Sequence, residues 1–443
     1  MELLNISFLW FTFFSFWCKI IWLKHLRVGE KMRKIVVIGG GAAGLMAAIS
    51  AGEKYRGMPS SITIIEKNPR PARKLMITGK GRCNVTNNCD IDTLIANIPK
   101  NPRFLYSAFS VFSPDDVMSF FKENGVPLKT ERGNRVFPVS DKAVDIVDAL
   151  VNSAKKYKCK FINGEADSIL TDDGMVSGVT LKNGDFIEAD SVILATGGKS
   201  YPVTGSTGDG YRIAQELGHT VTDIKPSLVP LCCHEGFCTK LSGLSLKNVL
   251  LQVFEKDKKR PAFKEFGEMI FTHFGISGPL VLSASAKMRY MDKKEYIAKI
   301  DLKPALTVEQ LDNRILRDFS EFQNKDFINS LDKLLPKSLI PVIVSLSGIE
   351  SDRKVNQISR EERLNLCLVI KSLTLHITGT RPIEEAIITS GGVSVKEIIP
   401  GSMESKIVKN LFFAGEIIDV DALTGGFNLQ IAFSTGYLAG TKA

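Results

Sequence analysis

Apolar and polar positions predict alternating strands and helices from about residue 32 onward. The run Ile35-Val36-Val37-Ile38 is apolar and β-branched, as is typical of a strand buried on both faces of a parallel sheet. Small and aliphatic residues after Gly44 predict a helix packed on that strand. A second apolar run, residues 62–65, ends at Glu66. The pattern therefore predicts a β-α-β unit at the start of an α/β domain.

A glycine-rich turn joins the first predicted strand to its helix, with the spacing Gly39-x-Gly41-x-x-Gly44. The first glycine allows a tight turn, the second lets the backbone approach a pyrophosphate, and the third lets helix and strand pack closely. Glu66 follows about 22 residues later, where a carboxylate can accept hydrogen bonds from a ribose. Because it would repel a 2′-phosphate, the pattern predicts a site for FAD or NAD and not for NADPH.

The segment 73–87 is dense in glycine, cationic and amide residues, which predicts a loop that follows a polar ligand. Arg73 and Lys74 can face a pyrophosphate, and Gly79 and Gly81 allow the backbone to contact a flat ring. The alternative is a solvated surface loop. Its position directly after the ribose-binding acid favours contact with a ligand.

Residues 114–158 predict two scaffold helices that flank a short strand pair. An antiparallel meander is then predicted over residues 161–169, 176–181 and 186–188, with turns at Asp173-Gly174 and Asn183-Gly184. The next strand ends in Ala195-Thr196-Gly197-Gly198, and such an end can lie against an adenine or a pyrophosphate. The glycines of residues 201–210 open a helix but match no second dinucleotide fingerprint. A nicotinamide cofactor would therefore bind only transiently.

Alternating apolar segments over residues 226–303 predict a mainly β module. Within it, a glycine- and serine-rich turn follows His273; this histidine and Tyr201 are candidate catalytic residues, although a lone histidine is more often structural. Two capping boxes, Thr307 with Gln310 and Ser359 with Glu362, predict amphipathic helices beyond the β module. The apolar stripe of the first helix predicts core packing, over Val308, Leu311, Ile315, Phe319 and Phe322.

The last 35 residues predict a return to the nucleotide. A strand over residues 411–413 leads to Gly415, Glu416 and Asp419, and Thr424-Gly425-Gly426 opens a final helix. A helix start can stabilise the negative charge of a reduced flavin, and acids near a strand end can bind ribityl hydroxyls. Two nucleotide-facing segments near opposite ends of the chain indicate one long ligand, FAD.

Composition describes a globular protein of 443 residues, large enough for two or three domains, with a net charge of +9. The charge suits anionic ligands, but the Lys and Arg residues are spread along the chain, so a nucleic-acid partner is not favoured. Eight cysteines at irregular spacings predict no disulfide framework and favour a reducing compartment. Neither the group Cys232, Cys233, His234 and Cys238 nor the pair Cys83 and Cys89 has the spacing of a metal or redox motif, so no metal is predicted.

Residues 1–31 differ from the rest. Residues 3–23 hold all three tryptophans and one charge, Lys19, and are long enough to cross a bilayer. Because the positive charges follow the apolar run, a secretory signal is not expected. A membrane anchor, of a dehydrogenase that reduces quinone, is the alternative, but a start at Met32 is favoured since a dinucleotide domain begins at this strand. A cytoplasmic protein is then expected.

Several motifs together resemble the bacterial FAD flavoproteins that include aminoacetone oxidases and BaiN-type 3-dehydro-bile-acid reductases. They are GGGAAG, TGKGRCNVTN, ATGGKSYPVTGSTGDG, THFGISGP, TSGGVSVKEI with MESK, and FFAGEIIDVDALTGGFNLQ. The resemblance spans residues 32–443. It implies an α/β, glutathione-reductase-type Rossmann-like FAD domain built from residues 32–200 and 375–443, with a β-rich insert over 201–303 and a helical insert over 304–374.

The resemblance also implies the residues that contact FAD. They come from the glycine turn, the acid and loop after it, the strand around residue 166, the strand end at residue 196 and the C-terminal return: Gly39, Gly41, Ala42, Ala43, Gly44, Glu66, Lys67, Lys74, Thr78, Gly81, Asn84, Ala166, Thr196, Gly197, Gly415, Glu416, Asp419, Gly426, Asn428 and Leu429. No catalytic base is implied.

The predicted activity is hydride transfer between flavin N5 and a small organic substrate, with NAD(P)H as electron donor. One alternative is an amine oxidase that uses O₂, as in the aminoacetone oxidases. The other, from a different class, is a flavin-containing RNA-modifying or RNA-binding protein.

Overall fold

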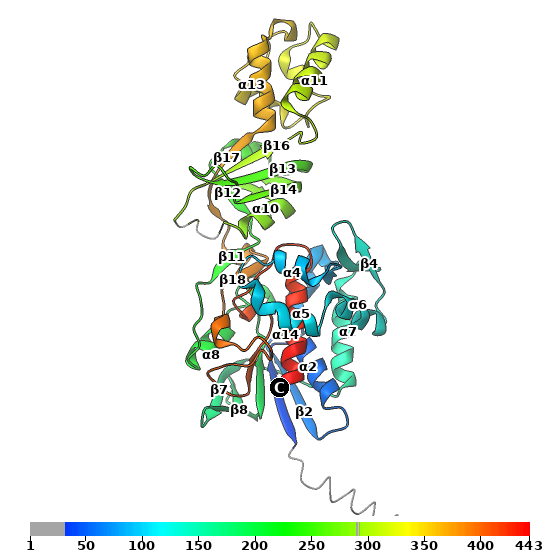
Figure 1. Cartoon of the computed structure of the whole chain (residues 1–443), viewed down its shortest axis with the longest axis vertical. Helices are drawn as coiled ribbons and strands as arrows, with labels where there is room; N and C mark the ends of the chain where they lie inside the picture. The colour runs from blue at the N-terminus through cyan, green and yellow to red at the C-terminus, as the bar shows by residue number, and fades with distance from the viewer. Residues whose placement is uncertain (1–31, 289–290, 292) are drawn as a thin grey trace, which may run out of the picture.

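The computed structural model describes residues 32–288, 291 and 293–443. An α/β domain forms the base of the molecule, a β-barrel the middle and a helical unit the tip (Figure 1). The predicted leader, residues 1–31, lies outside the described residues. No helix in the described part of the chain is long and apolar enough to cross a membrane.

Five parallel strands form the central sheet of the α/β domain. In β1, residues 35–38 are at most 4% exposed, because both faces of the sheet are covered. β1 pairs on one side with β10, Ile35 opposite Ser191, and on the other with β2, Ile35 opposite Ile62. The strand order is β19 (Leu411–Phe413), β10 (Ser191–Leu194), β1 (Arg33–Ile38), β2 (Ser60–Glu66) and β6 (Lys160–Asn163).

The first and last helices of the described chain pack against each other. A side-chain carbon at Gly436 or Gly440 of α14 (Phe427–Lys442) would lie 2.3 Å from the Ala43 oxygen or 2.1 Å from the Ala47 oxygen of α2 (Ala42–Lys54). Only glycine permits this close approach, which holds the two chain ends side by side. Further helices of the α/β domain are α3 (Arg73–Ile77), α4 (Ile91–Ala96), α5 (Tyr106–Val111), α6 (Pro114–Glu123) and α7 (Ala143–Lys156).

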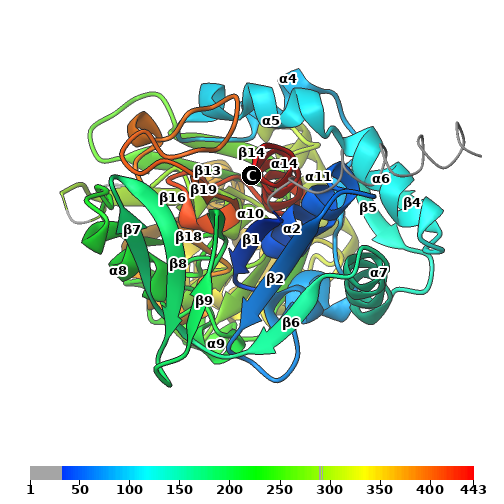
Figure 2. The ribbon, with the colours of Figure 1, turned by 90° about the horizontal axis from the view of Figure 1, so that it is seen from below.

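The predicted strand over residues 161–169 is wrong as one element. Its first part is β6, which joins the parallel sheet; the chain then turns away at Gly164, whose N–H donates to the Glu66 carbonyl over 3.0 Å. Its second part is β7 (Ala166–Asp172), which forms the predicted meander with β8 (Met175–Leu181) and β9 (Phe186–Glu188). Figure 2 shows this meander and α7 on opposite sides of the central strands.

The predicted strand pair in the scaffold region is also present. β4 (Leu128–Glu131) and β5 (Arg135–Pro138) form an antiparallel hairpin, and β3 (Thr86–Asn87) pairs with β5.

A closed six-stranded barrel follows the α/β domain in space. Its strands are β12 (Leu231–Cys233), β15 (Gly275–Ser277), β14 (Phe263–Thr272), β13 (Ser245–Glu255), β16 (Tyr296–Asp301) and β17 (Leu373–Thr380). The short helices α9 (Phe237–Lys240) and α10 (Pro279–Ser285) lie against it. β17 comes from beyond the helical unit, so the barrel closes only when the chain returns.

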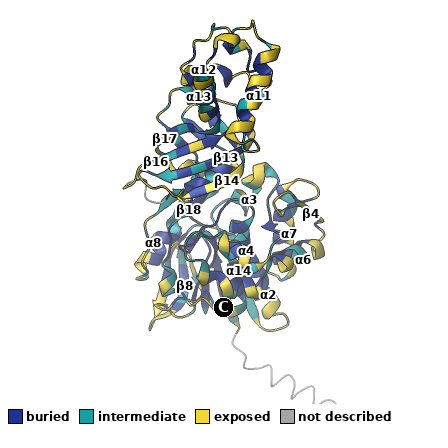
Figure 3. Cartoon of the chain, turned by 45° about the horizontal axis from the view of Figure 1, so that its top comes forward, coloured by how far each residue is buried: buried dark blue, intermediate teal, exposed yellow. Residues whose placement is uncertain are grey.

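The helical unit contains α11 (Val308–Glu321), α12 (Ile340–Ser347) and α13 (Arg360–Lys371). Both predicted capping boxes are confirmed: Thr307 and Gln310 bond each other reciprocally at the start of α11, as do Ser359 and Glu362 at the start of α13. From the predicted stripe, Leu311, Ile315 and Phe319 are buried in the same core as the barrel. Much of the remaining surface of α11 is exposed (Figure 3).

Two chain segments connect the α/β domain to the barrel, and they pair as β11 (Lys225–Ser227) and β18 (Ile388–Ser390). One large apolar cluster fills the α/β domain and another fills the barrel and helical unit together. Residues 201–224, with α8 (Asp209–Glu216), pack with the α/β domain. An α/β parallel-sheet domain that carries a β-rich part and a helical part confirms the predicted fold class.

Candidate functional site

The glycine turn lies at the carboxyl end of β1, and its three glycines have different surroundings. Gly39 has φ +104°, and a side-chain carbon there would lie 2.5 Å from the Ala195 oxygen. The same atom at Gly44 would lie 1.9 Å from the Gly39 oxygen, so the helix could not start so close to the strand. At Gly41 it would meet nothing within 4 Å. Gly41 therefore faces open space, where a phosphate can approach the backbone.

Glu66 ends β2 beside this turn. One carboxylate oxygen accepts a hydrogen bond from the Gly40 N–H over 2.8 Å, and the other accepts from the Asn68 N–H over 2.8 Å and from its side-chain amide over 2.7 Å. The Asn68 amide oxygen in turn accepts from Arg73 over 3.1 Å. These contacts fix the carboxylate at the rim of the glycine turn.

Lys67 reaches from β2 to the start of α8. Its ammonium lies 2.5 Å from both the Thr207 hydroxyl and the Asp209 carboxylate. Burial would raise the pKa of Asp209, but hydrogen bonds from Lys67 and Thr207 outweigh burial, and the pKa lies below its usual value. Asp209 is therefore ionised at neutral pH and keeps Lys67 in place.

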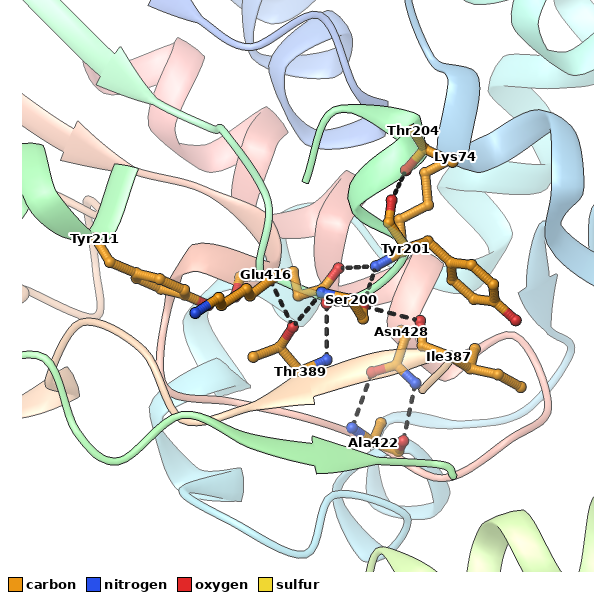
Figure 4. A network of polar contacts seen from close by, with 11 residues as sticks. Lys74, Ser200, Tyr201, Thr204, Tyr211, Ile387, Thr389, Glu416, Ala422 and Asn428 are labelled. Atoms are coloured by element: carbon orange, nitrogen blue, oxygen red, sulfur yellow. Dashed lines mark hydrogen bonds and ion pairs between the residues drawn. The ribbon is translucent and has the colours of Figure 1, made fainter. Parts of the chain in front are cut away.

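An ion pair between Lys74 and Glu416 lies on the side of the site formed by the chain end. The Lys74 ammonium is 2.7 Å from Glu416 and 2.7 Å from the Ser200 hydroxyl. The other Glu416 oxygen accepts from Ser200 over 3.1 Å and from the Thr389 N–H over 2.8 Å. Figure 4 shows these side chains turned toward one another. Four segments far apart in the sequence are thus joined at one carboxylate that is 13% exposed.

Tyr211 lies behind this carboxylate. Burial, and then the charges of Glu416 and Asp419, raise the pKa of Tyr211 well above its usual value. The phenol therefore stays protonated and donates to the Glu416 backbone oxygen over 3.4 Å.

The start of α14 opens toward the same space. Gly426 precedes the helix with φ +100°, and no side chain caps its first N–H groups. The Asn428 side chain instead holds the loop before the helix, since it accepts from the Ala422 N–H over 2.9 Å and donates to the Ala422 oxygen over 2.8 Å (Figure 4). The first turn is left with N–H groups able to face a ligand.

One cavity connects these parts, and fifteen of the predicted FAD-contacting residues line it. They are Gly39, Gly41, Ala42, Ala43, Glu66, Lys67, Lys74, Thr78, Ala166, Thr196, Gly197, Gly415, Glu416, Asn428 and Leu429. Residues from both ends of the chain therefore meet along a single space.

Five predicted contact residues are not in the cavity lining. Gly44 and Gly426 pack against backbone, at Gly39 and at Thr86. Asp419 pairs instead with Lys100 over 2.5 Å. Gly81 and Asn84 lie on either side of Arg82 in the chain. The Arg82 side chain points to the β4–β5 side, where it pairs with Glu131 and Asp141. For these five residues the contact with FAD stays a prediction.

The two candidate catalytic residues lie apart. His273 is exposed at the turn between β14 and β15, where its ring contacts Phe274. Tyr201 follows Ser200 of the ion-pair network with φ +51°, and Figure 4 shows its ring projecting away from that network. Neither lines the cavity.

Sequence reasoning missed a wall of the cavity made by Thr204, Gly205, Ser206, Gly208 and Asp209, and also Asn68, Ile387 and Ile388. The signal for the first group was its glycine-rich run after a buried strand that ends in two glycines. By itself this run predicts only the opening of a helix. For Ile387 and Ile388 no local pattern distinguishes a cavity wall from core.

The residues present fit FAD. Gly41 leaves room for a pyrophosphate, and the cavity runs from Glu66 past the Lys74–Glu416 pair to the start of α14. The Thr196 hydroxyl is buried at the cavity wall and has no partner within the described residues, so a polar ligand group could satisfy it. By contrast, the described residues contain no group of three or more His, Cys, Asp or Glu side chains arranged to hold a metal.

Comparison with known proteins gives both a family and relatives. The family described as "HI0933-like protein Rossmann domain" matches residues 33–442. A 3-dehydro-bile acid delta(4,6)-reductase of Clostridium scindens is 30% identical over 416 residues, which cover 93% of this chain and 99% of the relative. A ribosomal RNA dihydrouridine synthase of Haemophilus influenzae is 32% identical, covering 91% and 96%. A ribosomal RNA dihydrouridine synthase of Escherichia coli is 30% identical with the same coverage.

Proposed function

The chain belongs to the HI0933-like family, and from this premise we propose that it is a reductase of carbon–carbon double bonds conjugated with a carbonyl group. The membership confirms the resemblance predicted from the motifs, and the protein is an FAD-dependent oxidoreductase. The proposed substrate is a small organic molecule, and the proposed electron donor is NAD(P)H.

One observation carries this proposal: nearly full-length relatives with different printed substrates have one bond chemistry in common. A delta(4,6)-reductase of a 3-dehydro bile acid acts, by its name, on ring double bonds conjugated with a ketone. A dihydrouridine synthase saturates, by its name, the ring double bond of uridine, which is conjugated with a carbonyl. Reduction of such a conjugated bond by hydride transfer would place the hydride on the carbon distant from the carbonyl and a proton on the adjacent carbon. We propose the same bond chemistry for this chain, but neither of the two printed substrates.

FAD, when bound, would take up and release a hydride at N5 of its flavin ring. The glycine turn and Glu66 would hold its nucleotide end, and Lys74, Glu416 and Asn428 would hold the middle and the flavin end. The free N–H groups at the start of α14 would favour negative charge beside them, as helix N-termini do. The wall at Ile387 and Ile388 would exclude water from the apolar side.

Tyr201, whose ring lies outside the lining of the FAD cavity and projects away from the ion-pair network, is the proposed proton donor for the second carbon, through its phenolic oxygen, to a substrate bound on that side of the network. A bulky side chain with positive φ is a backbone outlier, and such strain is concentrated at functional sites. Tyr201 is directly followed by Pro202 and preceded by Ser200 of the ion-pair network, so its backbone is fixed on both sides. Tyr201→Phe should lower the rate of substrate reduction while leaving flavin reduction by NAD(P)H unchanged. His273→Ala is the comparison; if it alone lowers that rate, the donor is His273.

Anaerobic rapid mixing tests the main proposal. NADH or NADPH alone should bleach the flavin absorbance of the purified protein, and a cyclic enone should then restore it. Bleaching by primary amines, with none by NADH or NADPH, would contradict the reductase and support the amine oxidase. Restoration by O₂ but by no enone would also contradict it.

Ribosomal RNA is a second candidate substrate, because two of the relatives named above carry it in their names. The net charge of +9 is compatible with it. Unmodified ribosomal RNA, incubated with the reduced protein and digested to nucleosides, should then contain dihydrouridine by mass spectrometry. Binding that weakens steeply with salt would accompany this result. RNA left unmodified, while an enone is reduced, would exclude this candidate.

A further inference from the structure

The outside of the barrel carries aromatic and cationic side chains that do not belong to the FAD cavity. β14, β13, β16 and β17 are consecutive strands of the closed barrel (Figure 1). On β13, Leu251 and Val253 are fully buried, so they face the barrel interior. Because successive side chains of a strand point to opposite faces, Gln252 and Phe254 lie on the outside.

The strand pairing places a cationic row between two aromatic rings. Gln252 is opposite Lys264 of β14 on one side and opposite Lys299 of β16 on the other, and both lysines are exposed. Phe266, the next outward residue of β14, is 51% exposed. On the other side of the row, the Phe254 ring has its centroid 5.3 Å from the Lys299 ammonium. These five residues form what we call the outer barrel face.

The hairpin between β13 and β14 adds positive charge at one end of the outer barrel face. Lys258, Lys259 and Arg260 are exposed at its tip, with Asp257 as the acid beside them. Two further lysines at this end are paired with glutamates. Glu268 of β14 is an exposed acid at the opposite end. The lysines of β14 and β16 are far apart in the sequence, so only the folded barrel brings them together.

Aromatic rings on a sheet, with cations between them, are the features that bind single-stranded nucleic acid. Each base can stack on an exposed ring, and the phosphates between the bases can lie beside ammonium groups. Phe266 is opposite Leu250, four residues from Phe254 along β13. At a rise of ~3.4 Å per residue the two levels are about 13 Å apart. The two rings can therefore hold two separate bases, while the backbone of the nucleic acid crosses the lysine row.

We propose that the outer barrel face binds single-stranded RNA, with bases stacked on Phe254 and Phe266 and phosphates beside Lys264 and Lys299. An anionic membrane fits less well, because a polar row separates the two rings and the face has no continuous apolar surface that could enter lipid. RNA is preferred to DNA because ribosomal RNA is the second candidate substrate, and in this choice the inference rests on the proposed function.

Fluorescence anisotropy of a labelled single-stranded RNA of about 12 nucleotides, within the site sizes of such surfaces, tests the proposal on the full-length protein. The affinity should fall steeply as salt is added. Phe266→Ala should weaken binding by about fivefold or more, the loss expected for one stacked base. The matched control is Phe186→Ala, at a residue of β9 that is 54% exposed. It should bind RNA as tightly as the parent does.

Replacement of both lysines separates the phosphate contacts from base stacking. The double variant Lys264→Gln with Lys299→Gln should bind RNA more weakly. It should also reduce the slope of log affinity against log salt by about 1.4, since each phosphate contact with a single strand contributes about 0.7. Phe266→Ala should leave that slope unchanged. Lys122→Gln, at an exposed position of α6, is the control and should change neither affinity nor slope.

Several results would overturn the proposal. They are an RNA that does not bind at low salt, and RNA binding that neither Phe266→Ala nor the double lysine variant weakens. Tighter binding of DNA of the same sequence, or binding of anionic phospholipid vesicles in place of RNA, would assign the outer barrel face to those ligands instead.

The failure of this proposal can be distinguished from the failure of the proposed function. RNA that binds at the outer barrel face but gains no dihydrouridine would contradict ribosomal RNA as a substrate and leave the binding surface standing. Dihydrouridine formed equally by the parent and by Phe266→Ala, with equal RNA affinities, would leave the substrate standing and overturn the binding surface.

Discussion

At the residue scale, one carboxylate organises the flavin end of the cavity. Glu416 accepts hydrogen bonds from Lys74, Ser200 and the Thr389 backbone, and each donor comes from a different part of the chain. A buried or half-buried charge is costly unless its partners remain. The Lys74–Glu416 ion pair therefore stabilises the fold even when no ligand is bound.

Lys74→Met should destabilise the protein by about 1–3 kcal/mol, the range for hydrogen bonds to charged groups. The loss leaves a carboxylate that is 13% exposed with one donor fewer. Chemical denaturation measures the free energy of unfolding, and flavin fluorescence measures FAD affinity, which should fall as well. Lys122→Met, at an exposed position of α6, is the control and should change neither. An unchanged stability in Lys74→Met would mean that Ser200 and Thr389 suffice.

His219 gives the molecule a pH dependence outside the cavity. The ring is 3% exposed, Nε2 lies 2.9 Å from the Ser405 hydroxyl, and Nδ1 lies 3.3 Å from Glu397, a contact without the alignment of a hydrogen bond. Burial lowers the pKa of His219, and the nearby Glu397 charge only partly opposes this. The unfolded chain therefore binds a proton at a higher pH than the folded chain does.

Stability should fall as the pH decreases below the ordinary histidine value of about 6.5, because protons then favour the unfolded state. Unfolding free energies at a series of pH values between 7 and 5, for the parent and His219→Gln, measure the effect. The variant should be less stable at pH 7 but should lose less stability on acidification. If the unfolding free energy falls equally with pH in both proteins, groups other than His219 cause the pH dependence.

At the element scale, two glycines of the glycine turn, three residues apart, have different roles: Gly44 serves the packing of the fold and Gly41 leaves room for the ligand. Gly44→Ala should overpack the contact between β1 and α2, since its new carbon would lie 1.9 Å from the Gly39 oxygen, and should cost about 1–3 kcal/mol or more. Gly41→Ala meets no protein atom within 4 Å, so the fold should tolerate it while FAD binding weakens. Thermal unfolding without added FAD and FAD titration measure the two effects. Equal stability loss in both variants would contradict the assignment of Gly41 to ligand space.

Elements with a local signal could be predicted from the sequence. The strand, the glycine turn and the acid at Glu66 follow each other within about 30 residues, and the span of a β-α-β unit fixes their mutual position. The capping boxes at Thr307 and Ser359 are equally local. Contacts across the whole chain were not predictable. No pattern near β17 shows that it closes a barrel begun at Leu231, because the helical unit lies between them.

The same distinction between local signals and long-range contacts explains which residues of the site could be predicted. Glu66 could be identified because it ends a strand, and Glu416 because it follows the end of a strand by three residues. Their partners Asn68 and Thr389 could not, because neither the Asn68 side-chain amide nor the Thr389 backbone N–H carries a signature in the sequence. The strand break at Gly164 was missed for a related reason: both of its halves are extended, and only pairing with β2 makes β6 parallel.

At the scale of the whole molecule, two cores share one chain. The α/β domain and the barrel with its helical unit each have their own apolar cluster, and a third, much smaller cluster lies between them around Leu228, Ala286, Ile388 and Leu423. The two chain segments that connect them pair with each other as β11 and β18. Since the FAD cavity is built almost entirely from the first core, ligand binding and barrel stability should be separable.

Calorimetry should therefore resolve two unfolding transitions, because separate cores unfold as separate cooperative units. Added FAD should raise the temperature of one transition only, since a ligand stabilises the unit that binds it. Leu366→Ala removes a fully buried side chain of α13 and should lower the other transition, by about 2–5 kcal/mol of stability. Ile64→Ala, equally buried in β2, is the reciprocal variant and should lower the FAD-sensitive transition. If FAD shifts both transitions together, or either variant lowers both, the small interface cluster couples the two cores into one unit. The unfolding temperature of the barrel and helical unit would then depend on whether FAD occupies the cavity.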